Sequence, residues 1–212
     1  MAVLGTACAF LVANTKRLRT LRTDAVVRRV LAIVLVGNEV GSWGYQVVHG
    51  GRWGLPCQLC DLAVFLMAWA LLGRNRYVAE VAFCWGLAGS LQAVLTPDLS
   101  EGLASYAWVQ FFLGHCAIVL SAVYLAVRNR LRLTSASVWR VWLVTNLYIV
   151  IAGLLNWQLG TNFGYLASKP AHPSLLDALG PWPWYIVWME LLGLILFFCC
   201  LGFIRLVDRL AR

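Results

Sequence analysis

The 23-residue stretch WPWYIVWMELLGLILFFCCLGFI, residues 182–204, contains a single charged side chain, Glu190. A helix that crosses the hydrocarbon core of a bilayer needs about 17 to 25 predominantly apolar residues. The stretch therefore predicts a transmembrane helix. Five more apolar runs of similar length occur along the chain, at about 26–48, 55–73, 78–96, 106–127 and 138–160. We expect an all-α, polytopic transmembrane helical bundle with six full spans.

The composition supports this class. Hydrophobic residues make up 61% of the 212 residues and charged residues 12%, against roughly 25% charged in a soluble domain. Strands of a membrane barrel would alternate apolar and polar residues, and these runs do not. Because the connections between runs are short, we expect one transmembrane domain over residues 1–212.

The first 13 residues, MAVLGTACAFLVA, are apolar but too few for a full span, and basic residues follow them. A secretory signal carries its basic residues before the apolar core. We therefore interpret residues 1–13 as a short or truncated first span, which makes seven in total. A cleaved leader is the alternative.

The positions of Lys and Arg predict the orientation. Fifteen of the 17 lie in 14–29, 74–77, 128–140 and the C-terminal segment, whereas the opposite connections hold only Arg52 and Lys169. Cytoplasmic loops carry the excess of positive charge, so we expect the N-terminus outside and the C-terminus inside. The net charge of +8 then reflects topology and attraction to anionic lipid headgroups. Nucleic-acid binding is not expected, since no soluble module carries a basic surface.

Polar side chains interrupt five of the predicted spans at similar depth. At 1.5 Å per residue they lie roughly 6 to 14 Å below the outer surface: Glu39, Gln92, His115, Asn156 and Glu190. The inner half is plainer, with Asn146 as its main polar residue. Ionisable groups within a bilayer are costly and usually mark a site, although each could instead form an interhelical hydrogen bond. Together they predict a functional cavity in the outer half.

The stretch LPCQLCDLAVFL, residues 55–66, adds reactive groups at the outer end of a span. Pro56 suits the first helical position, which would place Cys60 about one turn into the helix. Unpaired N–H groups and the helix dipole favour a thiolate there. Asp61 follows the cysteine. His115, at similar depth, is a candidate general base for a Cys60 nucleophile.

The sequence also bears on four other kinds of site: redox, metal, transport and retinal sites. Cys57 and Cys60 form a CxxC motif, which leaves open thiol–disulfide exchange or a structural disulfide. We expect no metal and no cofactor, since no second cysteine or histidine pair at ligand spacing accompanies the motif. A transporter would place its site near the midplane between inverted repeats, and no repeat is evident. A retinal Schiff base is excluded because Lys16 and Lys169, the only lysines, lie outside the spans.

Several motifs together resemble the bacterial YwaF-like integral membrane family, whose animal relative is the transmembrane protein 164 family. They are LPCQLCDLAVFL, FCWGLAGSLQAVLTPDL, FFLGHCAIVL, VTNLYIVIAGLLNWQLGTNFGYL and LLDALGPWPWYI. Animal members are regarded as acyltransferases of ether phospholipids that use a membrane-embedded cysteine and a histidine, which correspond to Cys60 and His115. The resemblance implies a multi-pass protein of the bacterial inner or plasma membrane. The family often has a histidine where this chain has Gln58.

The resemblance predicts a phospholipid acyltransferase or transacylase that forms a thioester on Cys60 and passes the acyl chain to a lysophospholipid. Water as the acceptor would make it a lipase. Asp61 or Glu39 could orient the imidazolium, and Gln58, Gln92, Asn156 or helix N-terminal N–H groups could stabilise the oxyanion. Asp98 and Glu190 complete the predicted supporting residues, and the loop 161–180 could cap the cavity or simply connect two spans. The sequence carries no signal for oligomeric state.

Overall fold

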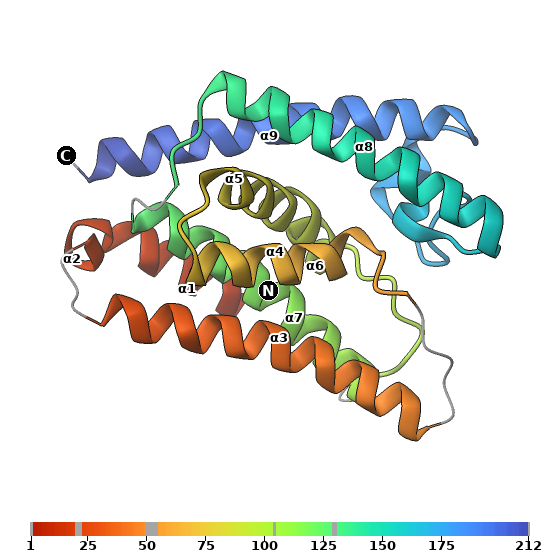
Figure 1. The fold of residues 1–212 in the computed structure, drawn as a ribbon, viewed down its shortest axis with the longest axis horizontal. Helices are drawn as coiled ribbons and strands as arrows, with labels where there is room; N and C mark the ends of the chain where they lie inside the picture. Colours follow the sequence, from red (N-terminus) through yellow and green to blue (C-terminus); the bar gives the residue numbers. More distant parts are fainter. Residues whose placement is uncertain (1, 20–22, 50–54, 104, 129–130, 212) are drawn as a thin grey trace.

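A computed structural model describes residues 2–19, 23–49, 55–103, 105–128 and 131–211. This part of the chain contains helices and no strand (Figure 1). The α-helices are α1 Ala2–Ala13, α2 Thr15–Arg19, α3 Asp24–Val48, α4 Leu59–Leu72, α5 Arg76–Cys84, α6 Leu91–Leu95, α7 Tyr106–Val127, α8 Ser135–Leu159 and α9 Trp184–Leu210. The π-helix η1, Trp85–Ser90, joins α5 to α6, and the short 3-10 helices η2, Phe163–Tyr165, and η3, Leu175–Leu179, lie between α8 and α9.

Four helical segments of the described chain are long and apolar enough to cross a membrane: the continuous helix Arg76–Leu95, then α7, α8 and α9. The predicted spans 26–48 and 55–73 correspond to helices of a different kind. α3 has 25 residues but carries more polar side chains, and α4 has 14 residues, about 21 Å at 1.5 Å per residue. The helical membrane bundle is confirmed, with four long apolar helices beside α3 and the short α1 and α4.

The helices form a bundle in which α8 and α9 lie side by side along one edge and α3 lies at the opposite edge (Figure 1). The core between them is made of large apolar side chains that are almost wholly buried, including Leu35, Met67, Phe83 and Leu125. Gly86 allows a close approach between helices, because a Cβ there would lie 2.8 Å from Ile118 Cγ2 and 2.9 Å from Met67 Cε. This approach fixes where η1 crosses the bundle.

Buried ion pairs occupy the end of the bundle where α3, α5 and α8 begin. Glu80 of α5 is 1% exposed, and its carboxylate accepts hydrogen bonds from Arg140 at 2.9 Å and Ser137 at 2.8 Å, both of α8. Asp24 of α3 pairs with Arg128 at 2.8 Å. The prediction that this half is the plainer one is wrong, because acids and bases from different helices neutralise each other there.

Four arginines that enter the predicted charge asymmetry lie outside the described residues: Arg22, Arg52, Arg130 and Arg212. The orientation of the bundle therefore stays a prediction. Asp208, near the end of α9, pairs with Arg19 of α2 at 2.7 Å. This contact holds the end of α9 against the N-terminal helices.

Candidate functional site

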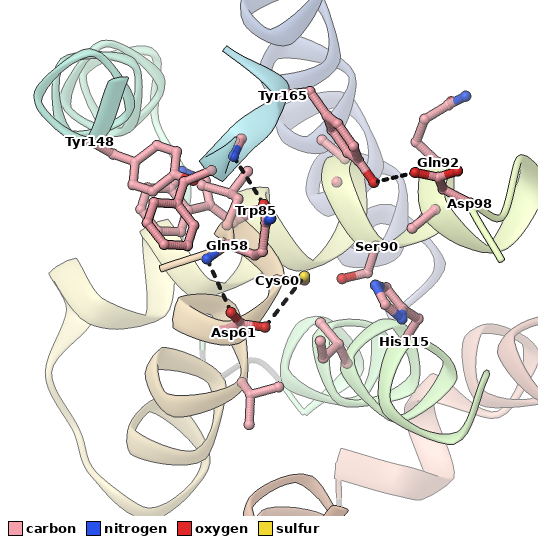
Figure 2. A pocket seen from close by; sticks show the side chains of 18 of the residues that line it. Gln58, Cys60, Asp61, Trp85, Ser90, Gln92, Asp98, His115, Tyr148 and Tyr165 are labelled. Atoms are coloured by element: carbon pink, nitrogen blue, oxygen red, sulfur yellow. Dashed lines mark hydrogen bonds between the residues drawn. The ribbon is translucent and has the colours of Figure 1, made fainter. Parts of the chain in front are cut away.

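A cavity of about 660 Å³ lies between α3, α4, α7, α8, α9 and the η1–α6 segment. The loop between α8 and α9, called the capping loop below, contributes Phe163, Tyr165 and Leu166 to the cavity lining, and its role as a cap rather than a plain connector stays a prediction. Eight of the nine predicted site residues line the cavity: Glu39, Gln58, Cys60, Asp61, Gln92, Asp98, His115 and Glu190. Asn156 is buried behind the wall instead. Figure 2 shows the central side chains converging from several helices.

The start of α4 differs from the predicted one. The helix begins at Leu59, and the Asp61 carboxylate accepts a hydrogen bond from the Gln58 N–H at 3.0 Å. Pro56 lies in a turn closed by the Cys57 N–H and the Leu55 carbonyl at 2.8 Å. The assignment of Pro56 to the first helical position is therefore wrong. Because the carboxylate caps the helix at Gln58, Cys60 is the second helical residue rather than one turn inside.

Cys60 and His115 both face the cavity but form no hydrogen bond with each other. The Cys60 thiol donates to Asp61 Oδ1 at 3.7 Å. The His115 Nδ1 lies 2.8 Å from the Phe111 carbonyl oxygen. Because a carbonyl only accepts hydrogen bonds, Nδ1 carries the proton, and the lone pair of a neutral ring lies on Nε2. His115 is thus oriented by its own helix as a proton acceptor toward the cavity (Figure 2).

Cys57 and Cys60 are both free thiols, so the structure contains no disulfide between them. Cys57 packs against the apolar cluster that includes Ala152, Phe163 and Leu166. Its carbonyl oxygen accepts a hydrogen bond from the Tyr148 hydroxyl at 3.0 Å. Cys57 therefore joins the start of α4 to α8 and to the capping loop, while Cys60 faces the cavity.

Two of the predicted supporting amides hold the capping loop. Gln58 Oε1 accepts from the Gly164 N–H at 2.9 Å, and its Nε2 donates to the Asn162 carbonyl at 3.4 Å. Asn156 binds both backbone groups of Phe163, donating to the carbonyl at 3.0 Å and accepting from the N–H at 2.7 Å. Both amides are thus engaged in positioning the loop.

Asp98 connects the loop after α6 to the capping loop. Its carboxylate accepts from the His172 ring Nδ1 at 2.7 Å, from the His172 N–H at 3.1 Å and from the Tyr165 hydroxyl at 3.2 Å. Burial raises the pKa of Asp98, but these hydrogen bonds outweigh the burial and hold its pKa below the ordinary value. Burial, together with the charge of Asp98, raises the pKa of Tyr165 to about 12. No motif in the sequence marks His172 as a partner of Asp98.

The remaining predicted residues have partners in the cavity wall. Glu190 Oε2 accepts from Asn146 Nδ2 at 2.8 Å, so the polar residue assigned to the plain inner half belongs to this site. Gln92 Nε2 donates to the Thr96 hydroxyl at 3.3 Å. Glu39 is 8% exposed and lies on α3. Among the described residues, no group of three His, Cys, Asp or Glu side chains is placed to hold a metal ion.

Ser90 lines the cavity although no motif or polar pattern in the sequence marks it. Ser90 ends the π-helix η1 and is 2% exposed. Figure 2 shows its hydroxyl facing the cavity between the Cys60 sulfur and the His115 ring in that view. A serine within an apolar run carries no motif, and only the three-dimensional packing of η1 brings it to the site.

No curated protein and no solved structure is significantly similar to the chain. A model of the TMEM164 family matches residues 1–201, which include every residue that lines the cavity. The long apolar helices of the chain agree with a multi-pass membrane location. On the strength of this match, the chain belongs to the TMEM164 family.

Proposed function

We propose that the protein is a phospholipid acyltransferase or transacylase of the bacterial cell membrane. In this proposal Cys60 is the nucleophile, His115 is the general acid and base, and the cavity lies in the outer half of the bilayer. The N-terminus is outside and the C-terminus is inside. Membrane phospholipid is the acyl donor and lysophospholipid the acceptor, both of which reach the site from the surrounding lipid.

One observation carries this proposal: a free Cys60 thiol and a His115 ring with an available Nε2 line the same cavity. Covalent acyl transfer by a cysteine requires a base that can take the thiol proton, and this cavity contains both groups. The Asp61 carboxylate, which accepts the thiol hydrogen bond, positions the sulfur at the start of α4. Both residues lie within 1–201, the part of the chain that matches the TMEM164 family model.

The reaction has two steps. His115 Nε2 takes the proton of the Cys60 thiol, and the sulfur attacks the ester carbonyl of the donor lipid. The carbon–oxygen bond then breaks, and the imidazolium returns its proton to the leaving lysolipid oxygen. In the second step His115 removes the proton from the acceptor hydroxyl, which attacks the thioester. The sulfur leaves and regains its proton from His115, so that the protein is unchanged.

Intact-protein mass spectrometry tests this proposal. The wild-type chain is incubated in nanodiscs of mixed phospholipids and compared with Cys60→Ser, His115→Ala and Cys57→Ser. We expect a hydroxylamine-labile acyl adduct on the wild type and on Cys57→Ser, and none on Cys60→Ser. His115→Ala should form the adduct about 100-fold more slowly, as expected for loss of a general base.

The cysteine variants also separate acyl transfer from thiol–disulfide chemistry. Acyl transfer through Cys60 does not need Cys57, whereas a CxxC exchange reaction needs both sulfurs. Loss of the adduct in Cys57→Ser as well as in Cys60→Ser would contradict the mechanism. Absence of any adduct on the wild type, with lipid present under slow turnover, would refute the acyltransferase itself.

A further inference from the structure

Among the described residues that line the cavity, Ser90 and Ser174 have buried hydroxyl oxygens without a hydrogen-bond partner, and of these two only Ser90 is buried as a whole residue. Its residue is 2% exposed, and its hydroxyl oxygen contacts no donor or acceptor of the protein. A buried hydroxyl that makes no hydrogen bond is unfavourable in a folded protein. Because Ser90 lines the cavity, a molecule bound there would supply the missing partner.

The backbone that carries Ser90 is also unusual. Residues Trp85–Ser90 form a π-helical segment within the otherwise α-helical span Arg76–Leu95. Segments of this kind are rare and frequently occur at functional sites. The segment cannot shift easily, because Gly86 is packed against Met67 and Ile118 at distances that leave no room for a Cβ. Ser90 is therefore held in a fixed position.

The other side chains predicted as oxyanion donors each already donate one hydrogen bond within the protein. Gln58, Gln92 and Asn156 donate to Asn162, Thr96 and Phe163 respectively. The first N–H groups of α4 have no carbonyl partner within the helix, as at any helix start, and one of them belongs to Cys60 itself. Figure 2 shows the Ser90 hydroxyl on the same side of the cavity as the Cys60 sulfur, which lies at the start of α4.

We propose that Ser90 is a further catalytic residue, whose hydroxyl donates a hydrogen bond to the carbonyl oxygen of an ester or thioester under attack at Cys60. When the sulfur–carbon bond forms, the electron pair of the carbon–oxygen double bond moves to the oxygen, which becomes negative. Ser90 keeps its proton and stabilises that charge by hydrogen bonding. The donor is fixed before the reaction, which is what makes such a contact effective.

Two reagents that attack the same sulfur test this role. The ester p-nitrophenyl octanoate acylates Cys60 through an oxyanion, whereas iodoacetamide alkylates it by displacement at a saturated carbon with no oxyanion. Both rates are measured at the Cys60 peptide by mass spectrometry on the full-length purified protein. Ser90→Ala should slow acylation about 100-fold, the usual effect of losing one oxyanion donor, and should leave alkylation unchanged.

Three controls accompany Ser90→Ala. Ser90→Thr keeps the hydroxyl and should retain acylation. Ser90→Val has the same shape as Ser90→Thr but no hydroxyl, and it should lose acylation. The Thr and Val pair isolates the hydroxyl even if alanine disturbs the helix. Ser121→Ala removes another buried hydroxyl without a partner, on α7 and outside the cavity lining, and should change neither rate.

The inference depends on the proposed function for its lipid substrate, but the ester reagent tests it without lipid. An equal loss of acylation and alkylation in Ser90→Ala would refute it, because the residue would then act on the structure or on thiol deprotonation. Unchanged acylation would refute it directly. A Ser90-dependent reaction with the ester, combined with no adduct from phospholipid, would uphold Ser90 and reject the acyltransferase.

Discussion

Asn156→Leu should release the capping loop from the cavity. The side chain makes three hydrogen bonds: to the Phe163 carbonyl at 3.0 Å, from the Phe163 N–H at 2.7 Å and from the Thr161 hydroxyl at 2.9 Å. Leucine has a similar size and forms none of them. At about 1 kcal/mol for each bond, the loss is about 3 kcal/mol, which corresponds to a roughly 100-fold increase in local opening.

Hydrogen–deuterium exchange of peptides covering 160–168 measures this opening directly. The Phe163 amide should exchange about 100-fold faster in Asn156→Leu than in the wild type, while amides of the α7 core keep their rates. Gln158→Ala, an exposed amide two residues away on the same helix, is the matched control and should change nothing. Exchange at Phe163 within threefold of wild type would show that packing against Ala152 and the Gln58 contacts hold the loop.

Three further predictions concern stability. Gly86→Ala should destabilise the fold by about 1–3 kcal/mol, because the added methyl group overpacks the core. Gly153→Ala has open space around the new Cβ and should stabilise the fold by about 0.5–1 kcal/mol. Thermal unfolding of the two variants measures the difference. Arg140→Met should cost about 1–3 kcal/mol, because it removes the shorter of two ion pairs of the buried Glu80 and leaves Arg76 and Ser137 as its partners. Combining it with Glu80→Gln should recover most of that cost in denaturant unfolding. Because the pKa of Asp98 is lowered in the fold, its carboxylate stabilises the loop above the unfolded pKa of about 3.9, and acid should release this stabilisation as the pH falls through the lower native pKa. Amide hydrogen exchange of residues 160–175, corrected for its intrinsic pH dependence, should become faster in acid. No such increase would show that ionised Asp98 does not stabilise the loop.

The lengths of the apolar runs predicted most of the helices. The runs 106–127, 138–160 and 182–204 each became a long helix with limits within a few residues, apart from the C-terminal extension of α9. Prediction was less accurate at residues 55–73, because hydropathy does not show that Asp61 caps the helix at Gln58. The π-helical segment Trp85–Ser90 was also not predicted.

Depth along each span predicted which residues reach the cavity. The rise of 1.5 Å per residue holds within any single helix, so the sequence alone gives the depth of each residue in its span. Four residues placed at a similar depth in this way all line the cavity: Glu39, Cys60, His115 and Glu190. Asn156 lies at the same level and faces the loop instead. Depth is a one-dimensional quantity, and the direction of a side chain around its helix axis depends on the packing of the bundle.

The sequence by itself determined the class of the protein, an all-helical membrane bundle, because the cost of polar groups in hydrocarbon acts on each segment separately. Only the tertiary structure decided which polar groups meet. Glu80 and Arg140 are 60 residues apart, and Asp98 and His172 are 74 apart, yet each pair forms a short contact. Ser90 reaches the cavity through a local change of helix type. A hydrogen bond needs its donor and acceptor within a few tenths of an ångström of the best distance, and that placement depends on how all the helices pack together.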